Sequence, residues 1–474
     1  MGELKGFLKH KRKEQPHRPV EQRIKDYQKV ELPLTPDEIT QQAARCMDCG
    51  IPFCHGFGCS LGNLIPDFNE LVYEGRWQRA CELLHSCNNF PEITARVCPA
   101  PCEAACTLSV NDEPVMIRHI EYHIVERGFE QGWIKPQPPK AKTGKRIAVI
   151  GSGPAGLAAA QQLARTGHEV VVFEKNERPG GLLRYGIPDF KLEKNVIDRR
   201  LKQLKAEGVE FQTGVVVGED ISGRYLRKMF DCTLLAMGCE QPRDLKVPGR
   251  GHENILFAWD YLATQNKLCN GELADSAKAV TAKDKNVAVI GGGDTGSDCV
   301  GTARRQGAKN IYQLEILPQP PEERPIDTPW PEWPRIMRTS SSHEEGCERM
   351  WSVMTKKFTG IETRVSKLHA CKVDWKKDGD NWKIKEIPAT DFQLDVDLVL
   401  LALGFVHVSH QGLIEQLALE LDERGNIKVD SYQATLPWVF AAGDSTTGAS
   451  LVVKAITNGR QAAQVVDNWL KKNS

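Results

Sequence analysis

Short apolar runs alternate with helical segments through the chain after residue 145. Four of these runs have the character of strands, at Arg146 to Ile150, Val170 to Glu174, Val287 to Ile290 and Asp397 to Leu403. Runs that are apolar at almost every position suit strands buried on both faces, and their alternation with helices is typical of parallel sheets. The pattern therefore predicts an α/β fold with two such sheets.

The region before residue 135 follows a different pattern. Thr35-Pro36-Asp37-Glu38 has the form of a helix start, with proline at the first helical position and acids in the first turn, and it leads to Cys46. The stretch from Lys135 to Gly144 is rich in proline, which cannot continue a helix, and in lysine, which keeps it solvated. We expect a mainly helical N-terminal module that a linker joins to the α/β part.

The first strand of the α/β part leads into a dinucleotide fingerprint. It reads Gly151-Ser-Gly153-Pro-Ala155-Gly156, followed by a helical segment and, at the end of the next strand, Glu174. The first glycine permits the tight turn, the second lets a pyrophosphate approach the helix N-terminus, and the third lets helix and strand pack closely. Glu174 can accept hydrogen bonds from ribose hydroxyls.

A second fingerprint begins about 140 residues later. It reads Gly291-Gly-Gly293-Asp294-Thr295-Gly296, and Glu315 stands at the end of its next strand. An acid in that place binds the ribose diol and repels a 2′-phosphate, which favours NADH. Arg304 and Arg305 on the intervening helix could instead approach a 2′-phosphate, so NADPH stays open.

Nine of the fifteen cysteines fall between Cys46 and Cys106. Disulfides would need an oxidising compartment, which no other feature supports, and structural zinc usually takes paired CxxC or Cys/His spacing. Cys-x2-Cys-x4-Cys followed by remote cysteines is more typical of an iron–sulfur cluster. Cys81 and Cys87 lie in a helical stretch and are expected to be half-buried free thiols.

Composition limits the possible partners of this 474-residue chain. It has 62 Lys plus Arg and 62 Asp plus Glu, so no whole-chain field attracts nucleic acid. The N-terminus lacks the apolar core of a signal peptide, and no stretch reaches the roughly 18 apolar residues of a membrane span. We expect a cytoplasmic enzyme of two or three domains that binds neither nucleic acid nor membrane.

Six separated motifs give the whole chain a resemblance to the small (beta) subunits of glutamate synthase. They are Gly6-Phe-Leu8, Cys46-Met-Asp-Cys-Gly-Ile-Pro-Phe-Cys54, Pro179-Gly-Gly-Leu-Leu-Arg-Tyr-Gly-Ile-Pro188, Trp330-Pro-Glu-Trp-Pro334, Ser341-Ser-His-Glu-Glu-Gly346 and Ala441-Ala-Gly-Asp444. The resemblance implies FAD in the first nucleotide domain, NADH or NADPH in the second, and two 4Fe-4S clusters in the cysteine-rich module.

The resemblance also implies how the cysteines divide between the clusters. One cluster takes Cys46, Cys49, Cys54 and the remote Cys106, and the other takes Cys59, Cys98, Cys102 and a ligand that is not cysteine. The resemblance places Glu121 at this fourth position. The alternative is an ordinary helix-surface carboxylate, which would be exposed and turned away from Cys59. The short Cys98 to Cys102 gap and Phe57-Gly58 depart from some family members and put the loop geometry in doubt.

The flavin motifs set the expected domain limits. Gly181 and Leu182 resemble the segment that brings backbone close to the isoalloxazine. Gly443 and Asp444, followed by Ser450 and Leu451, resemble the returning FAD motif, in which the acid binds the ribityl chain. The resemblance therefore implies a cluster domain with linker over 1–143, an FAD domain over 144–252 and 405–474, and a nicotinamide domain over 253–404.

The implied reaction is hydride transfer from the nicotinamide to the flavin, which needs stacking and exclusion of water more than an acid or base. The clusters then carry single electrons to an FMN-containing large (alpha) subunit, where glutamine and 2-oxoglutarate yield glutamate. Met1-Gly2 offers no N-terminal cysteine for amide transfer, so a partner is expected. The alternative is a subunit of a ferredoxin-coupled NADP transhydrogenase or of a sulfide dehydrogenase.

Overall fold

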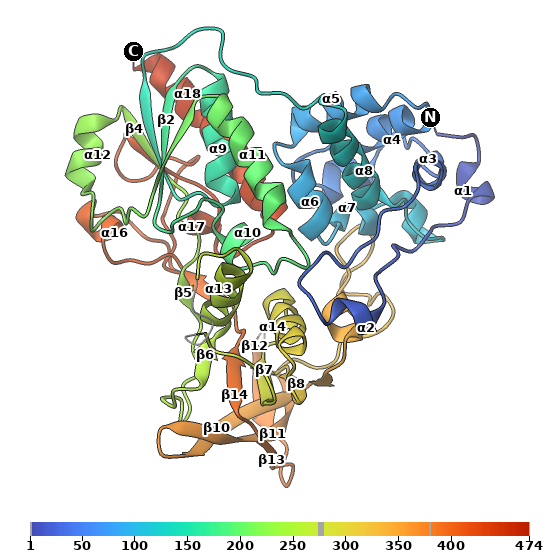
Figure 1. The fold of residues 1–474 in the computed structure, drawn as a ribbon, viewed down its shortest axis with the longest axis vertical. Helices are drawn as coiled ribbons and strands as arrows, with labels where there is room; N and C mark the ends of the chain where they lie inside the picture. The colour runs from blue at the N-terminus through green and yellow to red at the C-terminus, as the bar shows by residue number, and fades with distance from the viewer. Residues whose placement is uncertain (1, 274–278, 379–380, 474) are drawn as a thin grey trace.

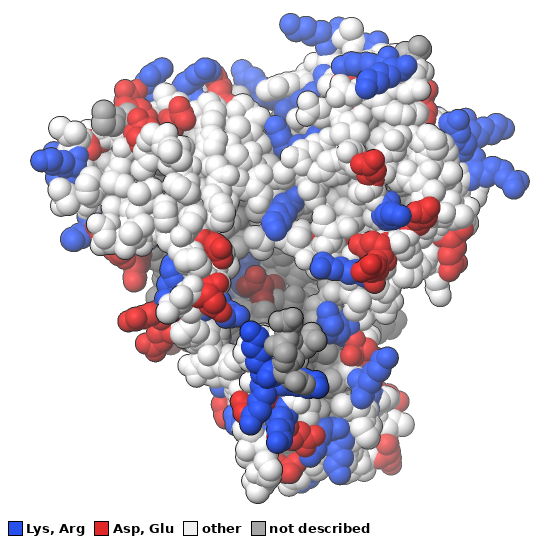
Figure 2. Space-filling model, turned by 180° about the vertical axis from the view of Figure 1, so that it is seen from behind, with Lys and Arg blue, Asp and Glu red and all other residues white. Residues whose placement is uncertain are grey.

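The computed structural model describes residues 2–273, 279–378 and 381–473. The chain forms three lobes (Figure 1). The cysteine-rich N-terminal lobe and the first nucleotide-binding lobe lie side by side, and the second nucleotide-binding lobe projects below them. Seen from behind, basic and acidic side chains are interspersed, and a recess opens between the lower lobe and the upper two (Figure 2).

The N-terminal lobe is built from helices, as the sequence predicts. They are α1 (Gly6–Lys9), α2 (Val20–Arg23), α3 (Pro36–Ala44), α4 (Ile65–Tyr73), α5 (Trp77–Cys87), α6 (Pro91–Val97), α7 (Pro101–Ala104) and α8 (Ile117–Glu130), with a π-helical turn over Cys54–Gly58 and a 3₁₀ turn over Thr107–Val110. Helix α3 begins where expected, because Thr35 and Glu38 form a reciprocal capping box. The apolar core of the N-terminal lobe includes Phe68, Leu84 and Ile120.

The first nucleotide-binding lobe contains a five-stranded parallel sheet in the order β16-β4-β1-β2-β3. Its strands are β1 (Arg146–Ile150), β2 (Glu169–Glu174), β3 (Val209–Thr213), β4 (Cys232–Leu235) and β16 (Val439–Ala441), and its helices are α9 (Pro154–Arg165), α10 (Leu182–Tyr185), α11 (Lys194–Ala206), α12 (Gly223–Met229), α16 (Leu413–Gln416), α17 (Asp444–Thr447) and α18 (Val452–Lys472). The C-terminal segment thus completes a sheet that the middle of the chain begins. Helices α9 and α18 pack together, and a Cβ on Gly459 would lie 2.1 Å from the carbonyl oxygen of Ala155.

The second nucleotide-binding lobe contains a parallel sheet in the order β6-β14-β7-β8-β9. Its strands are β6 (Ile255–Phe257), β7 (Asn286–Ile290), β8 (Asn310–Leu314), β9 (Glu348–Met350) and β14 (Leu398–Leu401), and its helices are α13 (Ala258–Cys269), α14 (Asp294–Arg305) and α15 (Ser341–Glu344). The prediction of two parallel sheets is confirmed.

An antiparallel sheet at the tip of this lobe was not predicted from the sequence. It consists of β10 (Val353–Ile361), β11 (Arg364–Asp378), β12 (Asn381–Glu386) and β13 (Phe392–Asp395). Where the chain crosses between the two nucleotide-binding lobes, β5 (Gln241–Pro242) pairs antiparallel with β15 (Phe405–His407). The two crossings are therefore adjacent in space.

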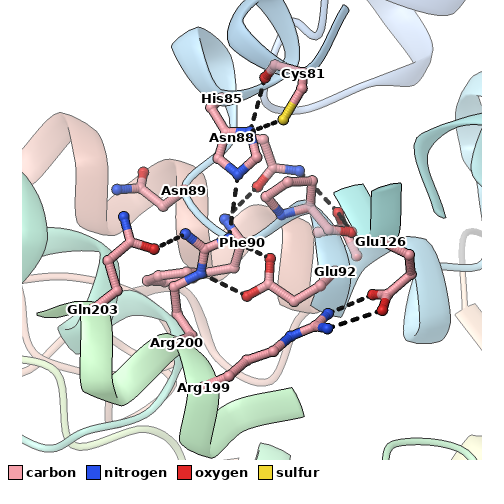
Figure 3. Close-up of polar contacts among 12 residues, drawn as sticks. Cys81, His85, Asn88, Asn89, Phe90, Glu92, Glu126, Arg199, Arg200 and Gln203 are labelled. Carbon is pink, nitrogen blue, oxygen red and sulfur yellow. Dashed lines mark hydrogen bonds and ion pairs between the residues drawn. The ribbon is translucent and has the colours of Figure 1, made fainter. Parts of the chain in front are cut away.

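The N-terminal lobe is docked on the first nucleotide-binding lobe through a shared core and a buried ion pair. Phe90 and Ile93 belong to the same apolar cluster as β1, α9 and α18. Arg200 of α11 donates to both carboxylate oxygens of Glu92, from Nε at 2.7 Å and from Nη2 at 2.6 Å, and Nη2 also donates to Nε2 of His85 at 3.2 Å. Figure 3 shows Arg200 extending between these two side chains. These contacts pack the N-terminal lobe against the first nucleotide-binding lobe.

The stretch from Lys135 to Gly144, which was expected to be a linker, lies within the described residues and forms neither helix nor strand. Among the helices that the structure describes, none is long and apolar enough to cross a membrane.

Candidate redox cofactor sites

Two small cavities in the N-terminal lobe separate the cysteines into two sets. The first is lined by Cys46, Cys49, Cys54 and Cys106, and the second by Cys59, Cys98, Cys102 and Glu121. The sets interleave along the sequence, because Cys106 lines the first cavity but follows the three cysteines that line the second. These are the two groups that the family resemblance implied.

Glu121 lies inside the second cavity rather than on the surface. Its side chain is on the inner face of α8, only 5% of the residue is exposed, and Oε1 accepts a hydrogen bond from Nδ2 of Asn63 at 2.8 Å. Burial raises the pKa of Glu121 to about 7. The geometry therefore does not match the alternative of an exposed carboxylate turned away from Cys59.

At Gly58, where the sequence departs from some family members, two ligand loops approach each other closely. A Cβ on Gly58 would lie 2.6 Å from the Cα atom of Cys102, so a side chain at this position would push the loops of the second cavity apart. Phe57 is 56% exposed and points out of the lobe. The short loop from Cys98 to Cys102 begins with proline and turns into α7 at Ala100, whose φ is 61°.

The buried cysteine thiols of both cavities are suited to bind a positively charged group. Burial raises the pKa of Cys59 to about 11 and that of Cys98 to about 12, and it raises the pKa of Cys46, Cys102 and Cys106 as well. Thiolates in such surroundings need bound cations to compensate their charge. Among the described residues, no three His, Cys, Asp or Glu side chains form a site for a single metal ion. Two rings of four ligands fit clusters, in which each ligand binds a different iron.

The first fingerprint loop has the geometry of a dinucleotide site. Gly151 has φ of 100°, and a Cβ on Gly156 would lie 2.0 Å from the carbonyl oxygen of Gly151. At Gly153, by contrast, a Cβ would meet no described atom within 4 Å beyond its own chain neighbours, which leaves space above the N-terminus of α9. Glu174 is 4% exposed and accepts from the backbone N–H of Ser152 at 3.2 Å.

The other expected flavin residues converge on this loop. Gly181, with φ of 53°, approaches so closely that a Cβ there would lie 2.9 Å from the Cα atom of Gly153, and Leu182 follows it as the first residue of α10. A Cβ on Gly443 would lie 2.7 Å from that of Ala155. Asp444 accepts from the hydroxyl of Ser450 at 2.7 Å, and Leu451 immediately precedes the first residue of α18. Burial raises the pKa of Asp444.

The second fingerprint repeats this geometry. A Cβ on Gly291 would lie 2.2 Å from the carbonyl oxygen of Ala402, whereas Gly293 again faces open space among the described atoms. Asp294 and Thr295 form the first turn of α14. Glu315 accepts from the backbone N–H of Gly292 at 2.7 Å and so lies beside the loop. Both loops therefore carry an acid in contact with the residue after their first glycine.

Arg304 and Arg305 lie in the last turn of α14, at the end remote from the fingerprint loop. Arg305 forms a fully buried two-point ion pair with Glu345, and Nε of Arg304 donates to the Glu345 carbonyl at 2.8 Å. Because α14 rises about 1.5 Å per residue, these groups are roughly 15 Å along its axis from Asp294. The distance of Arg304 and Arg305 from the fingerprint loop does not favour their contact with the 2′-phosphate of a bound coenzyme.

Three supporting residues were missed by the sequence analysis. Ser152 donates its hydroxyl to Glu174 and accepts from the N–H of Gly180 at 2.9 Å, which joins the two glycine segments. Gln313 donates to the Gly291 carbonyl at 2.9 Å, and Asn63 holds Glu121. Serine, glutamine and asparagine at these positions have no sequence signal of their own, because their role depends on contacts across elements.

Comparison with known protein families agrees with this division. Residues 145–459 match the family described as pyridine nucleotide-disulphide oxidoreductase, and residues 23–133 match the family described as dihydropyrimidine dehydrogenase domain II, 4Fe-4S cluster. The first match spans both fingerprints, and the second spans the seven cysteines and Glu121 that line the two cavities.

Individual relatives extend over the whole chain. A protein of Mycobacterium tuberculosis named glutamate synthase [NADPH] small chain is 50% identical over 100% of this chain and 97% of its own length. Glutamate synthase [NADH] of Schizosaccharomyces pombe is 44% identical over 98% of this chain, which corresponds to 23% of that longer protein. The solved structure of Mycobacterium tuberculosis FprA in complex with NADPH has the same fold over 69% of this chain and 85% of its own, with 17% identity and a TM-score of 0.56.

Proposed function

The chain belongs to the family of glutamate synthase small subunits, and from this premise we propose that it oxidises NADH and delivers the electrons to a glutamate synthase large subunit. The large subunit would use them to form glutamate from glutamine and 2-oxoglutarate. A transhydrogenase or sulfide-dehydrogenase subunit is not favoured, because relatives that match over at least 98% of this chain are named glutamate synthase.

We propose FAD as the group held by the first fingerprint. Open space at Gly153 and the positive end of α9 suit its pyrophosphate, buried Glu174 suits its ribose, and Asp444 suits its ribityl chain. Bound flavin accepts a hydride and releases electrons singly. The protein's part is to orient the ring, through the close backbone approach of Gly181, and to exclude water.

The coenzyme proposal rests on Glu315. Its carboxylate is placed beside the second loop by the N–H of Gly292, so a ribose diol can donate to it, whereas a 2′-phosphate there would meet a negative charge. Arg304 and Arg305 are engaged with Glu345. We therefore propose NADH as the coenzyme that this chain prefers.

Two 4Fe-4S clusters are proposed for the two cavities, with the cysteine sets and Glu121 as ligands. Clusters of this kind carry one electron at a time. Val453 of α18 lines the second cavity, so the cavity with Glu121 adjoins the FAD-binding lobe. The strand membership of the two parallel sheets supports the proposed domain limits of 1–143, 144–252 with 405–474, and 253–404.

The observation that carries the proposal is the sorting of eight ligands into two rings, one of them beside the flavin motif. Anaerobic purification followed by iron, sulfide and flavin analysis tests it. We expect about eight irons, about eight sulfides and one FAD per chain. Zinc without sulfide, or about four irons in wild-type protein, would contradict the two-cluster assignment.

A further inference from the structure

We propose that Glu345 is a positioning residue, which holds the nicotinamide-binding lobe against both other lobes in the orientation that hydride transfer needs. This inference rests on the proposed function. It concerns the Ser341-Ser-His-Glu-Glu-Gly346 motif, which forms α15 and the turn after it and contributes no residue to the cofactor loops themselves.

Glu345 joins two arginines from different lobes in a buried cluster. Arg305 of α14 makes its two-point pair with the carboxylate, and Nε of Arg23 donates to Oε1 of the same carboxylate at 2.8 Å. The side chains of all three residues are at most 1% exposed. Arg23 ends α2 in the N-terminal lobe, and its Nη2 also donates to the Ser341 carbonyl and to Glu344, both at 2.8 Å. The N-terminal lobe is therefore tied to the nicotinamide-binding lobe at this cluster.

The same cluster reaches the FAD-binding lobe. The Arg305 guanidinium lies over the ring of Phe190, 3.7 Å from its centroid, and a Cβ on Gly301 of α14 would lie 2.9 Å from that ring. The neighbouring Lys191 forms an ion pair with Asp298 of α14 at 2.5 Å. One face of α14 is thus held by the FAD-binding lobe while Glu345 holds its last turn.

A hydrogen-bonded chain connects α15 to the coenzyme loop. Nε2 of His343 donates to Oε1 of Gln313 at 2.8 Å, and Nε2 of Gln313 donates to the carbonyl of Gly291, the first glycine of the fingerprint. Through His343 the motif therefore supports the loop that holds the coenzyme. Through Glu345 it binds the N-terminal lobe directly at Arg23, and it holds Arg305, which contacts the FAD-binding lobe at Phe190.

A three-lobe junction of this kind suits the chemistry. Hydride transfer requires the two rings to be stacked at contact distance, and a displacement of about 1 Å can slow such a step about 100-fold. Here the two rings belong to different lobes, so the lobe orientation sets their alignment. A buried charge cluster has a narrow range of satisfactory geometries, because a displaced arginine would be left buried without its partner.

The test is the limiting rate constant of flavin reduction by NADH in Arg23→Met, measured anaerobically by stopped flow with the holoprotein. Arg23 is in the lobe that binds neither nucleotide. We expect the rate constant at saturating NADH to fall about tenfold or more, with the dissociation constant for NADH changed less than about twofold. The control is Arg18→Met, because Arg18 pairs with Asp26 inside the same N-terminal segment.

Arg23→Lys provides a second variant with the charge retained. The lysine ammonium cannot reproduce the four hydrogen bonds that the planar guanidinium donates, so we expect an intermediate rate constant. If Arg23→Met is isolated without iron or flavin, the rate constant of flavin reduction in Arg23→Lys is the deciding measurement. A wild-type rate constant in the folded variant overturns the inference, and so does an equal loss in Arg18→Met. If wild-type protein itself fails to reduce its flavin with NADH, the proposed function fails instead.

Discussion

At the residue scale, Glu121 is the one proposed cluster ligand that is not a cysteine, and it is held by Asn63 inside the second cavity. Cysteine spacing indicated a cluster but gave no fourth ligand, because the second ring takes its members from three separate segments. Family resemblance supplied Glu121, and its burial on α8 beside Asn63 agrees with that assignment. Asn63 itself carries no sequence pattern that marks it as a partner of the ligand.

The ligand proposal predicts a specific loss of iron in Glu121→Ala. We expect about four of about eight irons to be lost, because only the second cavity loses a donor. Iron and sulfide analysis after anaerobic purification measures this. Glu130→Ala is the matched control, since Glu130 lies on the exposed part of the same helix. Retention of full iron in Glu121→Ala would show that another group completes the ring.

The coenzyme proposal predicts a change of preference in Glu315→Ala. We expect the affinity for NADH to fall about 10- to 100-fold, because hydrogen bonds to a charged group contribute about 1.5–3 kcal/mol. Affinity for NADPH should fall less or rise, since the charge that repels the 2′-phosphate is gone. Titration of both coenzymes against wild type and variant measures the ratio. Wild-type preference for NADPH would contradict the role given to Glu315.

At the scale of elements, sequence periodicity predicted the parallel strands well and the antiparallel sheet not at all. Strand β1 is apolar at nearly every position, and its bounds were predicted from that run. In β10 and β11 charged residues are frequent, and two register shifts in their pairing interrupt the alternation of buried and exposed positions. The segment that carries Trp330 and Glu345 was recognised only by resemblance, because it contains little regular structure and several of its contacts are with the N-terminal lobe.

The two strand–loop–helix units predict different results for the same substitution. Gly153 and Gly293 have φ of −67° and −79°, which alanine adopts freely, and a Cβ at either would meet only the space proposed for pyrophosphate. We expect Gly153→Ala to lose FAD, and Gly293→Ala to keep FAD but bind NADH about tenfold or more weakly, at an overpacking cost of about 1–3 kcal/mol.

Visible spectra and coenzyme titrations distinguish these outcomes, and thermal unfolding of the two variants checks that the fold is unchanged. Loss of flavin from Gly293→Ala, or full flavin in Gly153→Ala, would contradict the assignment of the loops.

At the scale of the whole molecule, the contacts between lobes could not be read from the sequence. Glu92 and Arg200 are far apart in the chain, and nothing in either segment indicates that they meet in a buried pair. The motif Ser341 to Gly346 was visible in the sequence, but only the structure shows that Glu345 joins Arg23 to Arg305.

One lobe contact predicts a dependence of stability on pH. Burial, together with Arg200, lowers the pKa of His85 to about 4. Unfolding restores an ordinary pKa near 6.5, so below that pH the unfolded chain takes up a proton that the folded chain does not. The contribution of neutral His85 to the free energy of unfolding is fully present above about pH 6.5. It is lost progressively towards about pH 4, by up to about 3 kcal/mol.

Thermal unfolding of wild type and His85→Gln across this range measures the effect. The glutamine can still accept from Arg200 but cannot take up the proton, so we expect the variant to lose less stability on acidification. If stability falls equally with pH in the two proteins, His85 is not the cause of the loss.

Anaerobic stopped-flow mixing of the holoprotein with NADH tests the central claim most directly, namely that one chain passes electrons from a nicotinamide through a flavin to two clusters. The account predicts that flavin absorbance falls first and that the broad cluster absorbance falls afterwards, with NADH faster than NADPH. Cluster reduction without prior flavin reduction, or no change in flavin absorbance with either coenzyme, would contradict it.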